Sequence, residues 1–278
     1  MQRAWMSEAS ALPVTGPERI AAAFEGHGRG AALMPYLMGG FPSLQGSLEV
    51  GRVYAEYADL IEVGVPFSDP LADGPAIQAA GQRALEAGAT LERVLDEVAA
   101  PLAASVPVVV MCYANPIFAR GFARVAGALE ERGVAGLIVP DLPAAEAADL
   151  RDACDAAGIA LVPLVAPTTP PEALHRIGAS ARGFVYVVSV AGVTGERTEL
   201  PPELHAVVEQ VRANASVPPA VGFGIGTPAQ AAAVGQIADG VIIGSRLVRE
   251  VAEAPSLEQG LQGVDAFLRD TSAALRND

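Results

Sequence analysis

Residues 60–75 read LIEVGVPFSDPLADGP, and this stretch decides how the chain is interpreted. It opens as a short apolar strand that carries one carboxylate, Glu62. A parallel strand covered on both faces is normally apolar throughout, and an ionised carboxylate is buried there only if it is paired or if its pKa rises until it is protonated. Prolines and glycines then turn the chain sharply, and the turn delivers a second acid, Asp73. The pattern favours acid/base chemistry over a structural ion pair, with the pKa of Glu62 above its ordinary range.

Apolar segments of strand length alternate with helical segments along the chain, which predicts an α/β fold with a closed parallel sheet. The 278 residues suit a single (β/α)8 TIM barrel. We expect the barrel over residues 17–278, an extra helix over residues 17–25 that covers its bottom, and a flexible tail over residues 1–16. A doubly wound open sheet is the alternative, but no G-x-G-x-x-G follows the first strand. The expected strands are residues 31–38, 60–64, 106–113, 135–139, 159–165, 183–189, 219–223 and 240–243.

Between these strands, Ser43 and Thr227 are expected to cap helices. We expect residues 114–121 to form a loop, and a helix to follow residues 140–143 and run to residue 157.

The composition excludes several functional classes. A formal net charge of −14 argues against binding to nucleic acid or to an anionic membrane. All 18 basic residues are arginine, which excludes Schiff-base chemistry on a lysine. No apolar run is long enough to span a membrane, and the first dozen residues lack the apolar core of a signal peptide. The two cysteines, Cys112 and Cys154, form no disulfide framework and are expected to be reduced thiols, so we expect a cytoplasmic protein.

Glycine clusters follow the last two expected strands. Residues 222–226 read GFGIG, and Gly244-Ser245 follow residues 240–243. A glycine just before a helix lets backbone N–H groups face an anion, and TIM barrels commonly bind phosphate in these two loops. Either cluster alone fits an ordinary tight turn, but the two together favour a phosphate site.

The three histidines lie away from the expected strand ends, so neither a metal cluster nor a Ser-His-Asp arrangement can be assembled. The residues indicate a small phosphate-bearing substrate that Glu62 and Asp73 process by proton transfer. Isomerisation, epimerisation and retro-aldol cleavage all remain open at this point.

Residues 61–78, IEVGVPFSDPLADGPAIQ, are followed in order by MCYANPIF, VPDLP, SVAGVTG, VGFGI and IIGS. This series resembles the tryptophan synthase alpha subunit family, from about residue 17 almost to the end of the chain. The resemblance implies retro-aldol cleavage of indole-3-glycerol phosphate to indole and D-glyceraldehyde 3-phosphate, with no metal or cofactor in this chain.

The resemblance also implies a role for each site residue. Glu62 would move the proton at the indole C3 carbon, and Asp73 would accept the indole N–H and stabilise charge on the ring. Residues 190–200 are expected to close as a lid. The implied substrate-binding residues are Tyr186, Thr194, Gly195, Gly224, Gly244 and Ser245. Two residues depart from the family: Val190 stands where many members have arginine, and Phe41 stands where some members have aspartate.

A partner is implied as well, a pyridoxal-phosphate-dependent beta subunit in an assembly of two alpha and two beta chains. The residues implied to face it are Pro66, Asp69, Asn115 and Phe118. The alternatives are a stand-alone indole-3-glycerol phosphate lyase, another phosphate-binding barrel isomerase and a non-catalytic barrel. Retention of both Glu62 and Asp73 weighs against the last of these.

Overall fold

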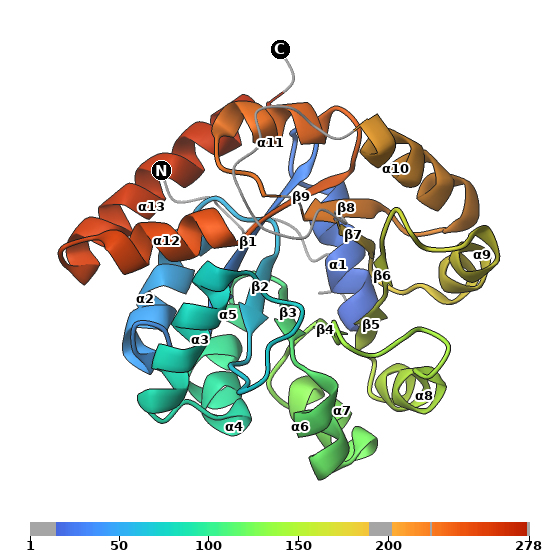
Figure 1. Cartoon of the computed structure of the whole chain (residues 1–278), viewed down its shortest axis with the longest axis horizontal. Coiled ribbons are helices and arrows are strands. Elements are labelled where there is room, and N and C mark those ends of the chain that lie inside the picture. Colours follow the sequence, from blue (N-terminus) through green and yellow to red (C-terminus); the bar gives the residue numbers. More distant parts are fainter. Residues whose placement is uncertain (1–14, 189–201, 223, 277–278) are drawn as a thin grey trace, which may run out of the picture.

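A parallel β-sheet surrounded by a ring of helices forms the framework of the molecule (Figure 1). The computed structural model describes residues 15–188, 202–222 and 224–276. Within these residues the sheet has nine strands in the order β5-β4-β3-β2-β1-β9-β8-β7-β6. The strands are β1 (Ala32–Met38), β2 (Ile61–Gly64), β3 (Val108–Met111), β4 (Gly136–Ile138), β5 (Ala160–Val162), β6 (Leu164–Val165), β7 (Val185–Val188), β8 (Pro219–Gly222) and β9 (Gly240–Ile243).

The two ends of this strand order are consecutive in the chain. Only Pro163 separates β5 from β6, and proline has no N–H to donate to a strand ladder. The strand expected over residues 159–165 is therefore split into two short ones, and the sheet runs from one to the other around the barrel. The parallel pairing and the alternation with helices confirm the expected (β/α)8 TIM barrel.

Helices connect the strands and cover the outside of the barrel (Figure 1). The expected caps are present: the Ser43 hydroxyl accepts from the N–H of Gly46, and Thr227 forms a capping box with Gln230. The helices are α1 (Gly16–Glu25), α2 (Leu44–Ala55), α3 (Pro75–Glu86), α4 (Leu91–Val94), the π-helical η1 (Leu95–Ala99), α5 (Ala100–Ala103), α6 (Ala114–Arg120), α7 (Phe122–Glu130), α8 (Ala148–Ala156), α9 (Pro171–Ser180), α10 (Pro202–Asn214), α11 (Pro228–Gly235), α12 (Ser245–Glu253) and α13 (Leu257–Ala274).

Two expectations about the connections are wrong. Residues 114–120 form α6 rather than a loop, because Pro116 lies in the first turn of the helix, where its missing N–H has no intrahelical partner to lose. The helix expected directly after residues 140–143 begins only at Ala148, and a turn closed by the Glu146 N–H and the Pro143 carbonyl (2.9 Å) precedes it.

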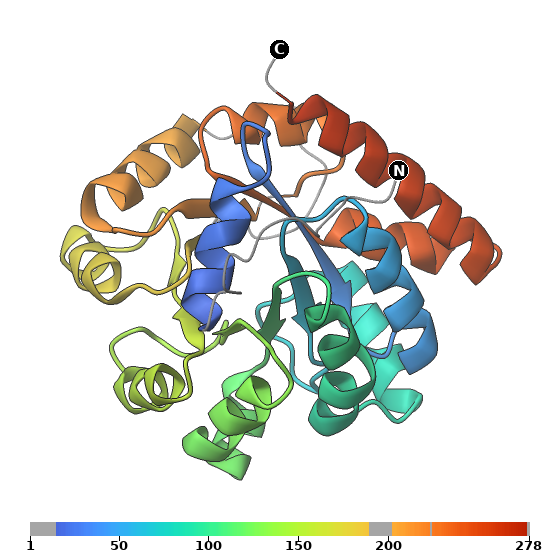
Figure 2. The same cartoon turned by 180° about the vertical axis from the view of Figure 1, so that it is seen from behind.

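Helix α1 closes the N-terminal end of the barrel, as the sequence predicts. Figure 2 shows it lying across the strands. Ile20 is fully buried among the side chains that fill the barrel interior. The Arg19 guanidinium donates to the carbonyls of Ala103 and Gly133, which lie ahead of β3 and β4. This end is therefore sealed, and only the opposite end, where the strands finish, is left for a site.

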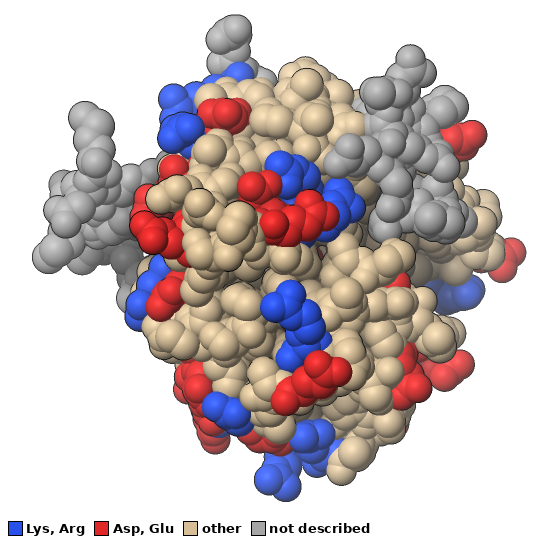
Figure 3. Space-filling model, turned by 60° about the vertical axis from the view of Figure 1, so that its left-hand side comes forward, with Lys and Arg blue, Asp and Glu red and all other residues tan. Residues whose placement is uncertain are grey.

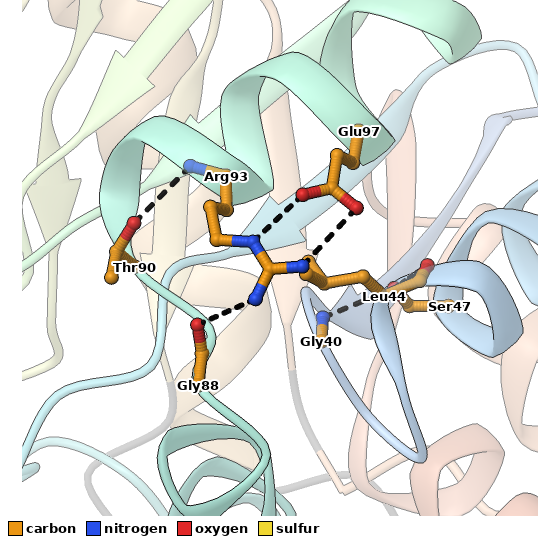
Figure 4. Close-up of polar contacts among 7 residues, drawn as sticks. All are labelled: Gly40, Leu44, Ser47, Gly88, Thr90, Arg93 and Glu97. Atoms are coloured by element: carbon orange, nitrogen blue, oxygen red, sulfur yellow. Dashed lines mark hydrogen bonds and ion pairs between the residues drawn. The ribbon is translucent and has the colours of Figure 1, made fainter.

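Two neighbouring turns near the end of β1 are held by local polar contacts (Figure 4). The Gly40 N–H donates to the Ser47 hydroxyl at 3.0 Å, and that hydroxyl donates to the Leu44 carbonyl at 2.8 Å. Nearby, Arg93 donates to the Gly88 carbonyl at 3.0 Å and pairs with Glu97 one turn later at 2.8 Å. The first set of contacts fixes the turn between β1 and α2. The second fixes the turn between α3 and α4.

On the face shown in Figure 3, arginine side chains adjoin acidic ones and do not merge into a continuous basic surface. In the Arg132–Asp96 and Arg120–Glu92 pairs, an exposed carboxylate is paired with an arginine that is itself only partly exposed. Among the helices that the structure describes, none combines the length and apolarity needed to cross a membrane.

One ion pair is almost completely buried. Arg29 and Asp59 have side chains only 3% and 5% exposed. Asp59 also accepts from the Leu33 N–H at 2.8 Å, and Arg29 donates to Ser272 on α13 at 3.2 Å. The pair thus ties the entrance of β1 to the C-terminal helix.

Asp59→Asn should leave the Arg29 cation buried without its counter-charge, and we expect it to lower the free energy of unfolding by about 3–5 kcal/mol. Urea unfolding measures this. The matched control is Glu97→Gln, which breaks the half-exposed Arg93–Glu97 pair of Figure 4 and should cost less than about 1 kcal/mol. Equal losses in the two variants would contradict the importance of burial here.

Candidate active site

A cavity of about 340 Å³ opens where the barrel strands end. The expected site residues that line it are Glu62, Asp73, Tyr186, Gly224, Gly244 and Ser245. The remainder is lined by Tyr36, by apolar side chains such as Ile77 and Leu164, and by Arg246 and Arg249 of α12. Thr194, Gly195 and the expected lid over residues 190–200 lie outside the described residues. A neighbouring cavity of about 390 Å³ is lined mainly by residues 139–147, after β4, and residues 161–164, of β5 and β6. It contains neither Glu62 nor Asp73, so the acid pair identifies the first cavity as the candidate site.

Glu62 lies on β2 in register with Tyr36 of β1 and Val109 of β3. It is 1% exposed, and neither carboxyl oxygen has a hydrogen-bond partner among the described residues. Burial, and secondarily the nearby charge of Asp73, raises the pKa of Glu62 to about 8. This agrees with the elevation expected from the sequence. At neutral pH Glu62 therefore carries a proton that it can donate.

Asp73 reaches the same cavity from the loop between β2 and α3. Its N–H donates to the Pro70 carbonyl at 3.1 Å, and its own carbonyl accepts from the Gln78 side chain at 2.9 Å. Burial raises the pKa of Asp73 to about 6, against the lowering effect of a hydrogen bond from the Tyr113 hydroxyl. At neutral pH Asp73 is therefore mostly ionised while Glu62 is protonated. The two acids have different charge states because they have different surroundings.

Tyr113 holds the loop that carries Asp73, a role that the sequence did not reveal. Its hydroxyl accepts from the Ala72 N–H at 3.1 Å and donates to Asp73. Its ring stacks on Phe67 with centroids 5.0 Å apart. Both contacts join the end of β3 to the loop after β2. The only sequence signal was the position of Tyr113 at the end of an apolar strand.

Tyr186 lies on β7 and leans over the neighbouring strand. A Cβ atom on Gly222 of β8 would collide with its hydroxyl, so this glycine provides the space. Burial, followed by the charges of Glu62 and Asp73, raises the pKa of Tyr186 well above its ordinary value. The phenol therefore keeps its proton beside the two acids.

Another part of the cavity wall is formed by Gly224 and Ile225, in the loop before α11, and by Gly244 and the start of α12. At α11, the Gln230 side chain accepts from the N–H groups of Gly226 and Thr227 at 2.7 and 3.1 Å. Helix α12 begins at Ser245 after Gly244 without a side-chain cap. Unpaired N–H groups at a helix start carry a partial positive charge and bind anions. Helix α12 thus presents the better anion site to the cavity.

The residues expected to face a partner lie on the loop between β2 and α3, which also carries Asp73, and on α6. Asp69, Asn115 and Phe118 are exposed, whereas Pro66 is buried. Phe118 is 55% exposed, and Leu71, which the sequence did not single out, is 92% exposed.

Among the described residues, no cluster of His, Cys, Asp or Glu side chains is arranged to hold a metal ion.

Comparison with known proteins identifies the family. The sequence profile of the tryptophan synthase alpha chain matches residues 24–276. The chain belongs to the tryptophan synthase alpha chain family. It is 50% identical over 228 residues to the tryptophan synthase alpha chain of Prochlorococcus marinus strain MIT 9313, covering 80% of this chain and 82% of that one. The family's reaction, cleavage of indole-3-glycerol phosphate, makes the chain a lyase of tryptophan biosynthesis.

Solved structures of tryptophan synthase have the same fold. A structure of the Mycobacterium tuberculosis tryptophan synthase superposes with a TM-score of 0.84 at 37% identity, covering 94% of this chain and 99% of that one. A structure of the tryptophan synthase α2β2 complex of Pyrococcus furiosus gives a TM-score of 0.81 at 34% identity, with 87% and 98% covered.

The buried Glu62 of this alpha chain family member should make the free energy of unfolding depend on pH. Because its pKa is raised from 4.5 to about 8, the folded chain retains a proton that the unfolded chain releases within that window. Stability should therefore fall as pH rises through the window, by up to about 1.4 kcal/mol per pH unit from this group. Glu62→Gln cannot ionise and should become the more stable protein by about pH 7.5.

Urea unfolding of both proteins at about pH 5 and about pH 7.5 measures this difference. Glu97→Gln serves as the control because its carboxylate is half exposed. A stability difference between Glu62→Gln and wild type that does not change with pH would show that Glu62 is not protonated in the folded chain.

Proposed function

We propose that this chain cleaves indole-3-glycerol phosphate with Glu62 as the proton-transferring group and Asp73 as the stabilising anion. The observation that carries the proposal is the pairing of a protonated Glu62 with an ionised Asp73 in one cavity. A proton donor and a fixed negative charge side by side suit a reaction in which an aromatic ring gains a proton and becomes cationic.

In the proposed first step, Glu62 gives its proton to the indole carbon C3. The ring becomes cationic, and Asp73 accepts the indole N–H, where the positive charge gathers. The resulting Glu62 carboxylate then takes the proton of the hydroxyl on the carbon attached to C3. That carbon becomes an aldehyde as the carbon–carbon bond breaks, and the bonding electrons return to the ring. Indole leaves, and Glu62 regains the proton with which it started.

The phosphate of the substrate is proposed to bind at the uncapped start of α12, at Gly244 and Ser245, with Gly224 opposite. Gly224 has φ of +29°, a conformation that suits glycine and brings backbone rather than a side chain to the cavity wall. Tyr186 is proposed to contact the substrate beside Glu62. Thr194 and Gly195 keep their expected roles as loop contacts to the substrate.

The two acids should differ in how their loss affects the reaction. Glu62→Gln cannot transfer a proton and should lower kcat at least about a hundredfold. Asp73→Asn loses the charge that opposes the cationic ring, so kcat should again fall about a hundredfold or more. Binding of glycerol 3-phosphate should change little in either variant, because the phosphate site is untouched. Single-turnover indole release and equilibrium binding measure the two quantities.

Activity of Glu62→Gln above a tenth of wild type would remove Glu62 from the central role. A loss of binding in Asp73→Asn that matches its loss of rate would make Asp73 a structural residue of the loop.

We further propose that the chain works with a beta subunit, in an assembly of two alpha and two beta chains, with pyridoxal phosphate bound by the beta subunit. The α2β2 complex of the Pyrococcus furiosus relative supports this. So do Leu71 and Phe118, two large apolar side chains exposed on the loop after β2 and on α6. Because the same loop carries Asp73, a partner seated here would contact the element that holds the stabilising anion. Pro66, Asp69 and Asn115 are proposed to complete the contact.

Leu71→Asp and Phe118→Asp should each weaken binding to a tryptophan synthase beta subunit at least tenfold, because each places a charge in an apolar contact. Both side chains are exposed, so the free energy of unfolding should change by less than about 0.5 kcal/mol. Binding is measured by calorimetry, with Glu258→Gln on α13 as the surface control. Full indole release by the isolated chain, with no binding to any beta subunit, would favour a stand-alone lyase instead.

A further inference from the structure

Tyr36 lines the same cavity as Glu62 and Gly244. It is on β1, 4% exposed, and its register neighbour on β2 is Glu62. On the other side, β1 pairs with β9 up to Ile243, the residue before Gly244. The strand order thus places Tyr36 between the acid and the glycine that begins the proposed phosphate site.

The hydroxyl of Tyr36 is directed toward the acid pair. A Cβ atom on Gly64 would collide with this hydroxyl and with the ring behind it. Gly64 lies two residues beyond Glu62 on the same strand, so both face the same side of the sheet. Burial, followed by the charges of Asp73 and Glu62, raises the pKa of Tyr36 well above its ordinary value. Its hydroxyl therefore remains a donor.

The base of the same side chain adjoins the phosphate site. A Cβ atom on Gly244 would meet the Cβ and Cδ1 atoms of Tyr36 at 3.5 Å. The side chain thus extends from Gly244, at its Cβ end, to Gly64, at its hydroxyl end. It follows the line that joins the start of α12 to the acids.

The Tyr36 hydroxyl is also available for a ligand. Among the described residues its one recorded polar contact is the Met38 sulfur, at 4.0 Å, and a thioether is a weak acceptor. By contrast, the hydroxyl of Tyr54, on the outer side of β1, donates to the Tyr36 carbonyl at 3.2 Å. A buried hydroxyl without a good partner favours a ligand that supplies one.

We propose that Tyr36 selects substrates by a hydrogen bond to the middle hydroxyl of the glycerol chain, on the carbon between the cleaved carbon and the phosphate-bearing carbon. The proposal rests on the function given above. With phosphate at Gly244 and the cleaved carbon at Glu62, the middle carbon lies alongside Tyr36. Tyr36 is then a positioning and specificity residue that prefers hydroxylated three-carbon phosphates, and it transfers no proton.

The test compares two unreactive ligands, glycerol 3-phosphate and 3-hydroxypropyl phosphate, which differ only in the middle hydroxyl. Wild type should bind glycerol 3-phosphate about two- to tenfold more tightly, the range of one neutral hydrogen bond. Tyr36→Phe should bind both ligands equally. Gly64→Ala should also lose the preference, because the added methyl group displaces the hydroxyl while Tyr36 itself remains. Competitive inhibition of indole release and calorimetry both report the preference.

Tyr54→Phe is the matched control. It removes one phenol oxygen from an equally buried tyrosine that touches the same strand from outside the cavity, and the preference should persist. A wild type that binds both ligands equally, or a Tyr36→Phe variant that keeps the preference, would overturn the proposal. Indole release by wild type is measured separately, so failure of the proposed function itself would be recognised by its absence.

Discussion

The burial of Glu62 is the constraint on which the site depends. A carboxyl group on a central strand, 1% exposed and without a hydrogen-bond partner among the described residues, costs free energy that the surrounding apolar core must offset. The same burial keeps the proton on Glu62 near neutral pH, because the ionised carboxylate would need solvation that the buried strand does not provide. The burial that lowers the stability of the folded chain at Glu62 is therefore also what lets this carboxyl act as a proton donor. Neighbouring strands hold the group in place by register with Tyr36 and Val109.

The two acids are supported in different ways. Glu62 belongs to the sheet, whereas Asp73 belongs to a loop that Tyr113 fastens to the end of β3. A loop held by a few local contacts, from the side chains of Tyr113 and Gln78, can shift with much less disturbance than a central strand. If a partner binds at the exposed Leu71, it contacts the loop that positions the anion and leaves the proton donor untouched. Such an arrangement would adjust the charge stabilisation of the indole ring. Because the charge of Asp73 also contributes to the raised pKa of Glu62, that pKa would shift as a secondary effect, while the burial that mainly sets it would stay the same.

Much of this could be predicted from sequence, and the exceptions have physical reasons. Glu62 and Asp73 were identifiable because an acid in an apolar strand and an acid on a proline-rich turn both break a local pattern. Helix α6 was missed because Pro116 resembles a loop signal, although the first turn of a helix tolerates it. The expected strand over residues 159–165 is divided at Pro163 because β5 and β6 pair with different strands. Strand pairing of this kind cannot be read from the sequence of a single strand. Tyr36 was missed because strand register, which places it beside Glu62, cannot be read from one strand.

The glycines beneath the two phenols have an evolutionary consequence. Tyr36 on β1 occupies the space above Gly64 on β2, and Tyr186 on β7 occupies the space above Gly222 on β8. In each case a phenol on one strand and a missing side chain on the neighbouring strand fill a single volume. Neither member can change size independently, so each pair should vary together among relatives. A larger residue at the glycine should be accompanied by a shorter one at the tyrosine, and substitution histories at these two pairs of positions should be correlated.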